Sequence, residues 1–309
     1  MSNSLFSLQV VVIIPIYNPD DKFRRLLFNL AKQSDVRFQV LLIDSGVDKS
    51  YQKYIPEELN VVIRKIAPVE FNHGGTRAWG MSLYPEADVY VFLTQDAILA
   101  DEYSLVKLVD AFSDDKVGAV YGRQLPHENA GLFARTARAI NYGEKSHVYS
   151  FGDKEKHGMK TCFMSNSFAA YRRRAMEDVD GFPVNTILSE DMYATAKMLM
   201  KGWNIGYAAD ARVYHSHNYT IMQEFKRYFD IGVFHARENW IRKTFGAAEG
   251  EGKKFVLYEI KEIMNNKPFL LLEMVFRDAA KWFGYRLGVM ERYLPVWIKK
   301  RISMNERFW

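Results

Sequence analysis

Short hydrophobic runs alternate with amphipathic stretches along the first 125 residues. Runs rich in Val, Ile, Leu and Phe predict five strands, at residues 9–17, 38–44, 60–66, 89–94 and 117–123. Between the first two, residues 20–33 predict a helix that Asp20 can cap, with one apolar face formed by Phe23, Leu26, Leu27 and Leu30. Because strands that alternate with helices form a parallel sheet covered on both faces, the pattern predicts an α/β fold.

The pattern changes in the second half of the chain. Residues 141–160 are rich in Gly, His and Lys without a clear period, so we expect a mobile loop there. A helix is expected to begin after Ser189, with Met192, Ala196 and Leu199 on one face. From about residue 221 onward two long amphipathic stretches predict helices. We therefore expect an α/β domain over residues 1–220 and a helical C-terminal extension over residues 221–309.

Charge separates these two parts. Residues 221–309 hold 17 Lys and Arg against 11 Asp and Glu, so this segment carries +6 and residues 1–220 carry −1. Basic residues interleaved with aromatic ones suit the anionic face of a membrane, although a solvated helical surface or a homo-oligomer contact would also fit. We expect no nucleic-acid partner. No apolar run reaches the roughly 18 residues of a spanning helix, and no signal peptide is evident, so a cytoplasmic or peripheral membrane location is expected. The single cysteine, Cys162, excludes an internal disulfide.

Polar residues follow several of the predicted strands directly. They are Tyr17 and Asn18 after the first strand, Asp44 at the end of the second, and Gln95 and Asp96 after the fourth. The carboxyl ends of parallel strands meet at one edge of a sheet, so these side chains should share a crevice. Asp44 can accept hydrogen bonds from a nucleotide there, or it can close an ordinary turn. Asp96 can bind Mg²⁺ or Mn²⁺ together with substrate phosphates, or it can act as a buried cap.

Three further segments could carry chemistry. The turn at His73, Gly74 and Gly75 runs into a helix with Arg77, where amides and a guanidinium could meet a phosphate, or where a helix simply begins.

Glu190 and Asp191 stand at the expected start of a helix, where they could be capping charges or could include a general base. Neighbouring helical positions diverge by about 100°, so only one of the two should face a substrate. Residues 213–217 alternate as a strand would, which places His215 and His217 on one face, either as structural residues or as metal ligands beside Asp96.

Taken together, these segments resemble the family 2 glycosyltransferases of the GT-A fold over roughly residues 9–220. The resemblance depends on Val12-Ile13-Ile14-Pro15-Ile16-Tyr17-Asn18, the strand-end Asp44, Thr94-Gln95-Asp96, Gly181-Phe182 and Glu190-Asp191. Three motifs are similar to the rhamnosyltransferase branch that builds bacterial cell-surface polysaccharides: Phe71-Asn72-His73-Gly74-Gly75-Thr76-Arg77, Leu93-Thr94-Gln95-Asp96-Ala97 and Tyr214-His215-Ser216-His217.

The resemblance implies a role for each candidate residue. Residues 1–125 would bind the nucleotide sugar, through Pro15, Tyr17, Asn18, Asp44, His73, Gly74, Arg77, Gln95 and Asp96. Residues 126–220 would bind the acceptor, with contacts from Gly181 and Phe182. A divalent metal, Mg²⁺ or Mn²⁺, would be held by Asp96 with His215 or His217, His215 being preferred. Asp191, with Glu190 beside it, would supply the catalytic base.

Two departures from the family pattern matter. Thr94 stands where the first carboxylate of the aspartate-x-aspartate motif is expected, which makes metal dependence an open question. The glutamine-x-x-arginine-tryptophan motif of processive synthases is absent, because Arg237-Glu238-Asn239-Trp240 does not match it, so one or a few sugars should be added.

The resulting hypothesis is an inverting transfer of a sugar from dTDP-rhamnose or a UDP-sugar to a lipid-linked saccharide. Asp191 would deprotonate the attacking hydroxyl group while Arg77 and the metal stabilise the departing diphosphate. The alternatives are a different hexosyltransferase, a sugar-phosphate nucleotidyltransferase that releases pyrophosphate, and a non-catalytic scaffold at the membrane surface.

Overall fold

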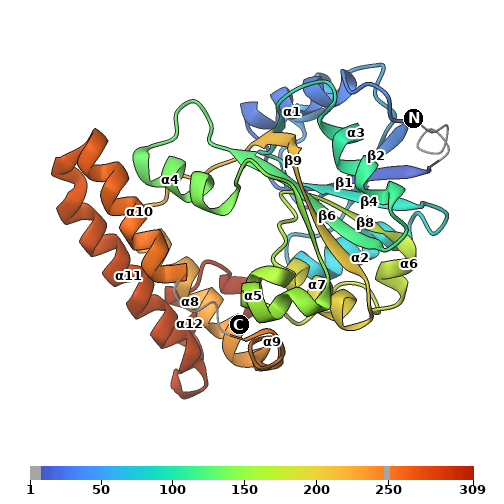
Figure 1. Ribbon diagram of the computed structural model, residues 1–309. Coiled ribbons are helices and arrows are strands. Elements are labelled where there is room, and N and C mark those ends of the chain that lie inside the picture. The colour runs from blue at the N-terminus through green and yellow to red at the C-terminus, as the bar shows by residue number, and fades with distance from the viewer. Residues whose placement is uncertain (1–7, 247–250) are drawn as a thin grey trace.

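A central β-sheet organises the protein (Figure 1). The structure is a computed structural model that describes residues 8–246 and 251–309. Within these ranges the sheet has nine strands in the order β3-β2-β1-β4-β8-β6-β9-β5, with β7 paired to β9. The strands are β1 (Val10–Ile16), β2 (Phe38–Asp44), β3 (Val61–Lys65), β4 (Val89–Leu93), β5 (Ile98–Leu99), β6 (Val117–Leu125), β7 (His147–Tyr149), β8 (Phe168–Arg172) and β9 (Asn204–Tyr214).

Most of the strands run in the same direction. β1 is parallel to β2 and β4, β2 is parallel to β3, and β6 is parallel to β9. Since β8 is antiparallel to both β4 and β6, these two strands also share a direction. The expected α/β class with a mostly parallel sheet is confirmed.

Helices cover both faces of the sheet. Successive residues of β1 accordingly belong to two different hydrophobic clusters, one on each face. Val10, Val12 and Ile14 belong to one hydrophobic cluster, with α1 (Asp21–Ala31) and α3 (Ser104–Val109). Val11 and Ile13 belong to the other, with α2 (His73–Ser82) and α7 (Glu190–Met200). Successive strand residues point to opposite faces, so a strand buried on both sides reads as a continuous apolar run.

The segment 141–160 is more regular than expected. It follows α4 (Leu132–Asn141) and contains β7, a short helix α5 (Lys154–His157) and 3-10 turns. β7 pairs with β9, and the ring of Tyr149 stacks on those of His147 and His157. The expectation of a loop was wrong because a three-residue strand is specified by its distant partner and shows no period of its own.

The C-terminal extension packs tightly against itself. It consists of α8 (Ile221–Arg237), α9 (Asn239–Phe245), α10 (Glu251–Asn266), α11 (Leu271–Val289) and α12 (Val296–Ile302). A Cβ atom at Gly232 would lie 2.3 Å from the carbonyl oxygen of Tyr285, and one at Gly288 would lie 2.0 Å from that of Phe229. Because no side chain fits at these positions, α8 and α11 approach backbone to backbone.

The extension is joined to the α/β domain and does not stand apart from it. Phe229 and Val233 of α8 and Phe245 of α9 belong to the same hydrophobic cluster as α2 and α7. The last residues are held by Asp230, which accepts hydrogen bonds from Ser303 Oγ at 2.6 Å and from the Met304 amide at 3.0 Å. Among the helices of the described residues, none combines the length and the apolar character that crossing a bilayer requires.

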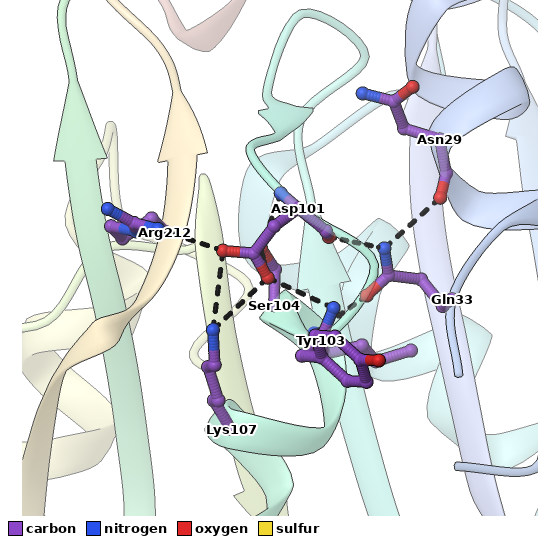
Figure 2. A network of polar contacts seen from close by, with 8 residues as sticks. Asn29, Gln33, Asp101, Tyr103, Ser104, Lys107 and Arg212 are labelled. Carbon is purple, nitrogen blue, oxygen red and sulfur yellow. Dashed lines mark hydrogen bonds and ion pairs between the residues drawn. The ribbon is translucent and has the colours of Figure 1, made fainter. Parts of the chain in front are cut away.

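A polar network fixes the strands that carry the site (Figure 2). The carboxylate of Asp101, just after β5, accepts hydrogen bonds from Arg212 of β9 at 3.0 Å and from Lys107 of α3 at 3.3 Å. Gln33, after α1, donates to the Asp101 carbonyl at 2.8 Å. The network therefore ties the chain after Asp96 to the end of β9.

Candidate active site

The loops after β1, β2 and β4 form one connected floor. Gln95 accepts a hydrogen bond from the Tyr17 amide at 2.8 Å and donates to its carbonyl at 3.2 Å. Asn18, with φ of 41°, accepts from the Val47 amide at 3.0 Å. Pro15 lies within β1, opposite Ile43 of β2. Tyr17, Asn18 and Gln95 thus meet at the carboxyl edge of the sheet, and the Tyr17 side chain is half exposed.

Asp44 is buried beneath this floor. Its side chain is 1% exposed and accepts hydrogen bonds from the Tyr51 hydroxyl at 2.8 Å and from the Gly46 amide at 2.9 Å. Burial, followed by the hydrogen bond to Asp44, raises the pKa of Tyr51 well above its ordinary value. The turn foreseen as the alternative for Asp44 is therefore formed, and its carboxylate braces the loop after β2.

Asp96, His215 and His217 come together at the next strand end. The carboxylate of Asp96 lies 3.4 Å from Nε2 of His215 and 3.8 Å from Nδ1 of His217. Ile98 of β5 pairs with Tyr214 of β9, and this antiparallel pairing brings the two segments together. The alternating sequence pattern predicts that both histidines lie on a strand. β9 ends at Tyr214, however, so His215 and His217 lie in the segment that follows it.

The imidazole of His215 is oriented by Gln124 at the end of β6. Gln124 Oε1 lies 2.8 Å from Nδ1 of His215 and also accepts a hydrogen bond from Arg138. A guanidinium only donates, so the atom that faces Arg138 must be the amide oxygen. In the neutral, metal-binding form of the ring, Nδ1 of His215 therefore carries the proton, and the lone pair of Nε2 is directed at Asp96.

This cluster has the chemistry of a divalent-metal site. One potential ligand atom from each of Asp96, His215 and His217 lies within 4.8 Å of the others. A carboxylate with two neutral imidazoles suits Mn²⁺, and a partner on the second ring nitrogen is the usual way to orient a ligating histidine. Without a metal, burial opposes ionisation of Asp96, but the hydrogen bond and charge of a protonated His215 outweigh it and hold the pKa of Asp96 well below its usual range. The residues therefore fit a divalent metal.

Glu190 and Asp191 begin α7 and point in different directions. Glu190 is 5% exposed, forms an ion pair with Arg77 at 3.1 Å and accepts from the Asn166 side chain at 2.9 Å. Asp191 is less buried and accepts from the Asn166 amide at 3.0 Å and from the Met192 amide at 2.8 Å. Glu190 is thus bound to partners in the protein interior. The carboxylate oxygens of Asp191 still have lone pairs that can accept a hydrogen bond from a further donor.

The pKa values of Glu190 and Asp191 are shifted in opposite directions. Burial, and then the negative charge of Glu190, raise the pKa of Asp191 from 3.8 to about 7, although two backbone amides partly oppose this. Burial also opposes ionisation of Glu190, but the guanidinium of Arg77 lies against it and the pKa of Glu190 is lowered. A carboxylate with a pKa near 7 is suited to accept a proton at neutral pH.

The segment from His73 to Arg77 anchors α2 to the loop before α7. A Cβ atom at Gly74 would lie 1.9 Å from the carbonyl oxygen of Pro183, so only glycine fits there. Arg77 is 5% exposed and also donates to the His73 carbonyl at 2.9 Å. In this structure Arg77 faces Glu190 in the interior and not the crevice where a diphosphate was expected.

Phe182 lies inside the fold, and the preceding Gly181 is partly buried. Phe182 is 3% exposed, and its ring makes edge contacts with Phe92 at 5.3 Å and Tyr171 at 5.2 Å between centroids. Gly181 adopts φ of 72°, which favours glycine. Phe182 is therefore a core residue, packed between Phe92 and Tyr171 and not exposed to an acceptor.

Several residues of the site escaped the sequence analysis. Gln124 donates to Ser165 Oγ at 2.8 Å, and the next residue, Asn166, binds Asp191. Gln124 is the second-last residue of β6, so the strand-end rule applied to the other strands could have identified it. For Ser165 and Asn166 the sequence gives no local signal. These residues connect the metal cluster to Asp191.

The C-terminal segment reaches the Tyr17 side of the floor. The Arg307 guanidinium lies 5.9 Å from the centroid of the Tyr17 ring and donates to the Pro68 carbonyl at 2.6 Å. Asn305 lies 3.2 Å from Nε2 of His73. A cavity of about 320 Å³ lies between this segment and the start of α2. The extension therefore contributes to the edge of the crevice.

Comparison with known proteins agrees with this geometry. Residues 9–230 match the family model described as glycosyltransferase like family 2. The chain is 45% identical over 302 residues to the O-antigen chain rhamnosyltransferase RfbN of Salmonella typhimurium, covering 98% of this chain and 96% of the relative. It is 43% identical over 299 residues to the O-antigen chain rhamnosyltransferase WbaN of Salmonella anatum, with 96% and 95% covered.

Solved structures share the fold at low sequence identity. The mannosyltransferase PcManGT from Pyrobaculum calidifontis, in complex with GDP-Man and Mn²⁺, matches with a TM-score of 0.56 and 20% identity over 88% of this chain and 73% of that chain. S. aureus TarS 1-349 matches with a TM-score of 0.58 and 17% identity over 96% and 84%. The resemblance to family 2 glycosyltransferases is thus confirmed. The chain belongs to glycosyltransferase family 2, has the GT-A fold and is a glycosyltransferase.

Proposed function

We propose that this protein transfers L-rhamnose from dTDP-rhamnose to a hydroxyl group of a lipid-linked saccharide, with inversion, during synthesis of a cell-surface polysaccharide. Two relatives at 43% and 45% identity are named O-antigen chain rhamnosyltransferases, and each covers nearly the whole chain. The observation that carries the proposal is the connection of Asp191 to the Asp96 cluster. Ser165 contacts Gln124, which orients His215, while Asn166 binds Asp191.

Asp191 is the catalytic base in this proposal. Its carboxylate accepts the proton of the acceptor hydroxyl as the hydroxyl oxygen forms a bond to the anomeric carbon of the sugar. The bond between that carbon and the diphosphate breaks in the same step, so the configuration inverts. The raised pKa of Asp191, about 7, matches this role because general bases work best when their pKa is close to the working pH.

Asp96, His215 and His217 would hold a divalent metal. When bound, such an ion supplies positive charge that stabilises the departing diphosphate. The protein's own contribution is orientation: Gln124 fixes the tautomer of His215 so that a nitrogen lone pair faces Asp96.

The connected floor is proposed to bind the nucleotide. Tyr17 offers an exposed ring for stacking, while Asn18, Gln95 and the buried Asp44 hold the loops in place. Pro15 extends the floor into β1, and His73 and Gly74 close it from α2. Arg77 has a positioning role in this scheme, since it fixes Glu190 and through it the start of α7. The exposed Arg307 guanidinium lies 5.9 Å from the centroid of the Tyr17 ring and would attract the anionic donor.

We also propose that α11 and α12 rest on the membrane surface. Phe276, Trp282 and Trp297 are 57%, 59% and 68% exposed on these helices, and cations such as Arg286 and Lys300 lie among them. Exposed aromatic and aliphatic side chains combined with Lys and Arg favour an anionic bilayer interface. A peripheral location would bring the active site to a lipid-linked acceptor.

A donor panel tests the function. The purified protein is incubated with Mn²⁺, a lipid extract that contains saccharide intermediates, and dTDP-rhamnose, UDP-glucose, UDP-galactose or GDP-mannose in turn. We expect release of nucleoside diphosphate with dTDP-rhamnose and incorporation of rhamnose into the lipid fraction. Transfer with another donor only would overturn the choice of sugar, and pyrophosphate release from dTTP and a sugar phosphate would favour a nucleotidyltransferase.

A further inference from the structure

A second cavity lies where the C-terminal extension meets the α/β domain. It has a volume of about 530 Å³ and is enclosed by α4, α8, α10 and α11. His217, a residue of the metal cluster, and Asn218 line it together with Phe255 of α10 and Lys267. Pockets of this size accept small organic ligands. The cavity therefore leads from the metal cluster into the extension.

Most of the charges around this cavity neutralise one another. Arg277 of α11 lies 3.2 Å from Glu224 of α8 and 2.7 Å from Glu273. Lys281 lies 3.0 Å from Asp278 and 3.9 Å from Glu224. These pairs hold α8 and α11 together, and within residues 8–246 and 251–309 none of these cations forms an ion pair with a further carboxylate of the cavity, although the charge of Lys281 acts on it.

Glu259 of α10 is that further carboxylate. It lines the cavity, its side chain is 1% exposed, and its Oε2 atom has no hydrogen-bond partner among the described residues. Burial raises the pKa of Glu259 to about 7. A buried polar atom without a partner is costly and rare in native proteins. Glu259 therefore brings an oxygen without a hydrogen-bond donor to the wall of the cavity, where a donor on a ligand would satisfy it.

The other walls fit a saccharide. Phe133 of α4 lines the cavity with Arg277 held 4.4 Å from its ring centroid, and Tyr219 follows His217 with the two rings 5.1 Å apart. Sugars combine hydroxyl groups, which bind carboxylates and guanidinium groups, with apolar C–H faces, which pack on aromatic rings. The cavity offers both kinds of surface.

A metal ion is a less suitable occupant. Within residues 8–246 and 251–309, the groups of three or more potential ligands close enough to share an ion comprise Asp96, His215 and His217 alone. Glu259 belongs to no such group. Its missing partner is therefore better supplied by a hydroxyl group than by a cation.

We propose that this cavity binds the saccharide of the acceptor, and that Glu259 accepts a hydrogen bond from one of its hydroxyl groups. The inference rests on the proposed glycosyl transfer and adds the place and the recognition residue for the acceptor. A saccharide that occupies the cavity contacts His217, and Gln124, Ser165 and Asn166 connect the cluster of this histidine to Asp191. Acceptor recognition would thus depend on α10 and α11, outside the part of the chain that matches the family model.

Glu259→Gln tests the proposal, with Glu262→Gln on the same helix as the matched control. Glu262 does not line the cavity. Binding is measured by saturation-transfer NMR with a panel of octyl hexosides (galactoside, glucoside, mannoside and N-acetylglucosaminide) on the full chain, without donor. Kinetics are measured with hexosyl diphosphate lipids bearing the same sugars. Because Glu259→Gln removes a buried unpaired charge, we expect no fall in Tm.

We expect Glu259→Gln to weaken binding of the preferred hexoside about tenfold or more and to raise the acceptor KM by a similar factor, with the donor KM unchanged. Glu262→Gln should behave as the native protein. Hexoside affinity and acceptor KM that are unchanged in Glu259→Gln would overturn the proposal. A loss of Mg²⁺ or Mn²⁺ binding in Glu259→Gln but not in Glu262→Gln would overturn it as well. Hexoside binding without any sugar transfer would contradict the proposed function but not the saccharide site.

Discussion

Asp191→Asn should lower the activity of the enzyme and make its stability less dependent on pH. General-base help is worth about 10² to 10⁴ in rate, so kcat should fall by about that factor. The pKa of Asp191 rises from 3.8 to about 7 in the folded protein. Each pKa unit corresponds to about 1.4 kcal/mol, so ionising this side chain costs about 4 kcal/mol more in the folded state than in the unfolded chain.

The sign of the pH effect follows from linkage. Between about pH 4 and pH 7 the folded protein keeps a proton on Asp191 that the unfolded chain has released, so this contribution to stability is lost as pH rises towards 7. An asparagine does not ionise, so the stability of the variant does not fall with pH for this reason. The variant does lose one hydrogen bond, because the side-chain nitrogen of asparagine cannot accept from the backbone amide of Asn166 or Met192. That bond is worth about 1 to 3 kcal/mol. We therefore expect Asp191→Asn to gain roughly 3 kcal/mol relative to the native protein between pH 5 and pH 8.

Urea unfolding followed by tryptophan fluorescence, with EDTA present, measures this difference. Asp180→Asn is the matched control, because the Asp180 side chain is 94% exposed and should change neither rate nor pH dependence. In the native enzyme, kcat/KM should rise with pH and level off above about 7. A stability difference that is the same at pH 5 and pH 8, or native turnover in Asp191→Asn, would refute the reasoning.

Three further perturbations test separate parts of the account. Gln124→Leu should weaken Mn²⁺ binding about 10- to 100-fold in calorimetry because the ligating imidazole loses its orienting partner, and unchanged affinity would argue against that arrangement. Arg77→Met should cost about 3 to 5 kcal/mol in urea unfolding because Glu190 is left charged and buried, and an unchanged midpoint would show that the pair is not formed. Phe276→Ser combined with Trp282→Ser should reduce co-sedimentation with phosphatidylglycerol vesicles, and equal binding would exclude α11 as the docking face.

Long apolar runs made much of the fold predictable. β1, β2 and β4 follow the expected strands to within one residue at each end, because strands buried on both faces need nearly every residue to be apolar. The helix after β1 begins at Asp21 with Asp20 as its cap, as expected. Because these strand ends were predictable, the rule that polar residues follow parallel strands identified Tyr17, Asn18, Gln95 and Asp96.

The rest of the site depends on contacts between distant segments. The two-residue strand β5 shows no period, yet its pairing with β9 is what brings Asp96 to His215. The burial of Arg77 against Glu190 depends on the packing of α2 on α7, which the local sequence of neither segment reveals. The same holds for Glu259, whose missing partner becomes evident only when α4, α8, α10 and α11 are assembled around it.

The configuration of the product tests the central claim most directly. Purified enzyme, dTDP-rhamnose and the accepted lipid-linked saccharide are combined, and the anomeric configuration of the new rhamnosyl bond is read by NMR from its one-bond carbon–hydrogen coupling. A single displacement assisted by Asp191 predicts a rhamnosyl bond whose configuration is inverted relative to the donor. It also predicts that Asp191→Asn forms this bond far more slowly than the native enzyme. A product that retains the configuration of the donor would contradict the account.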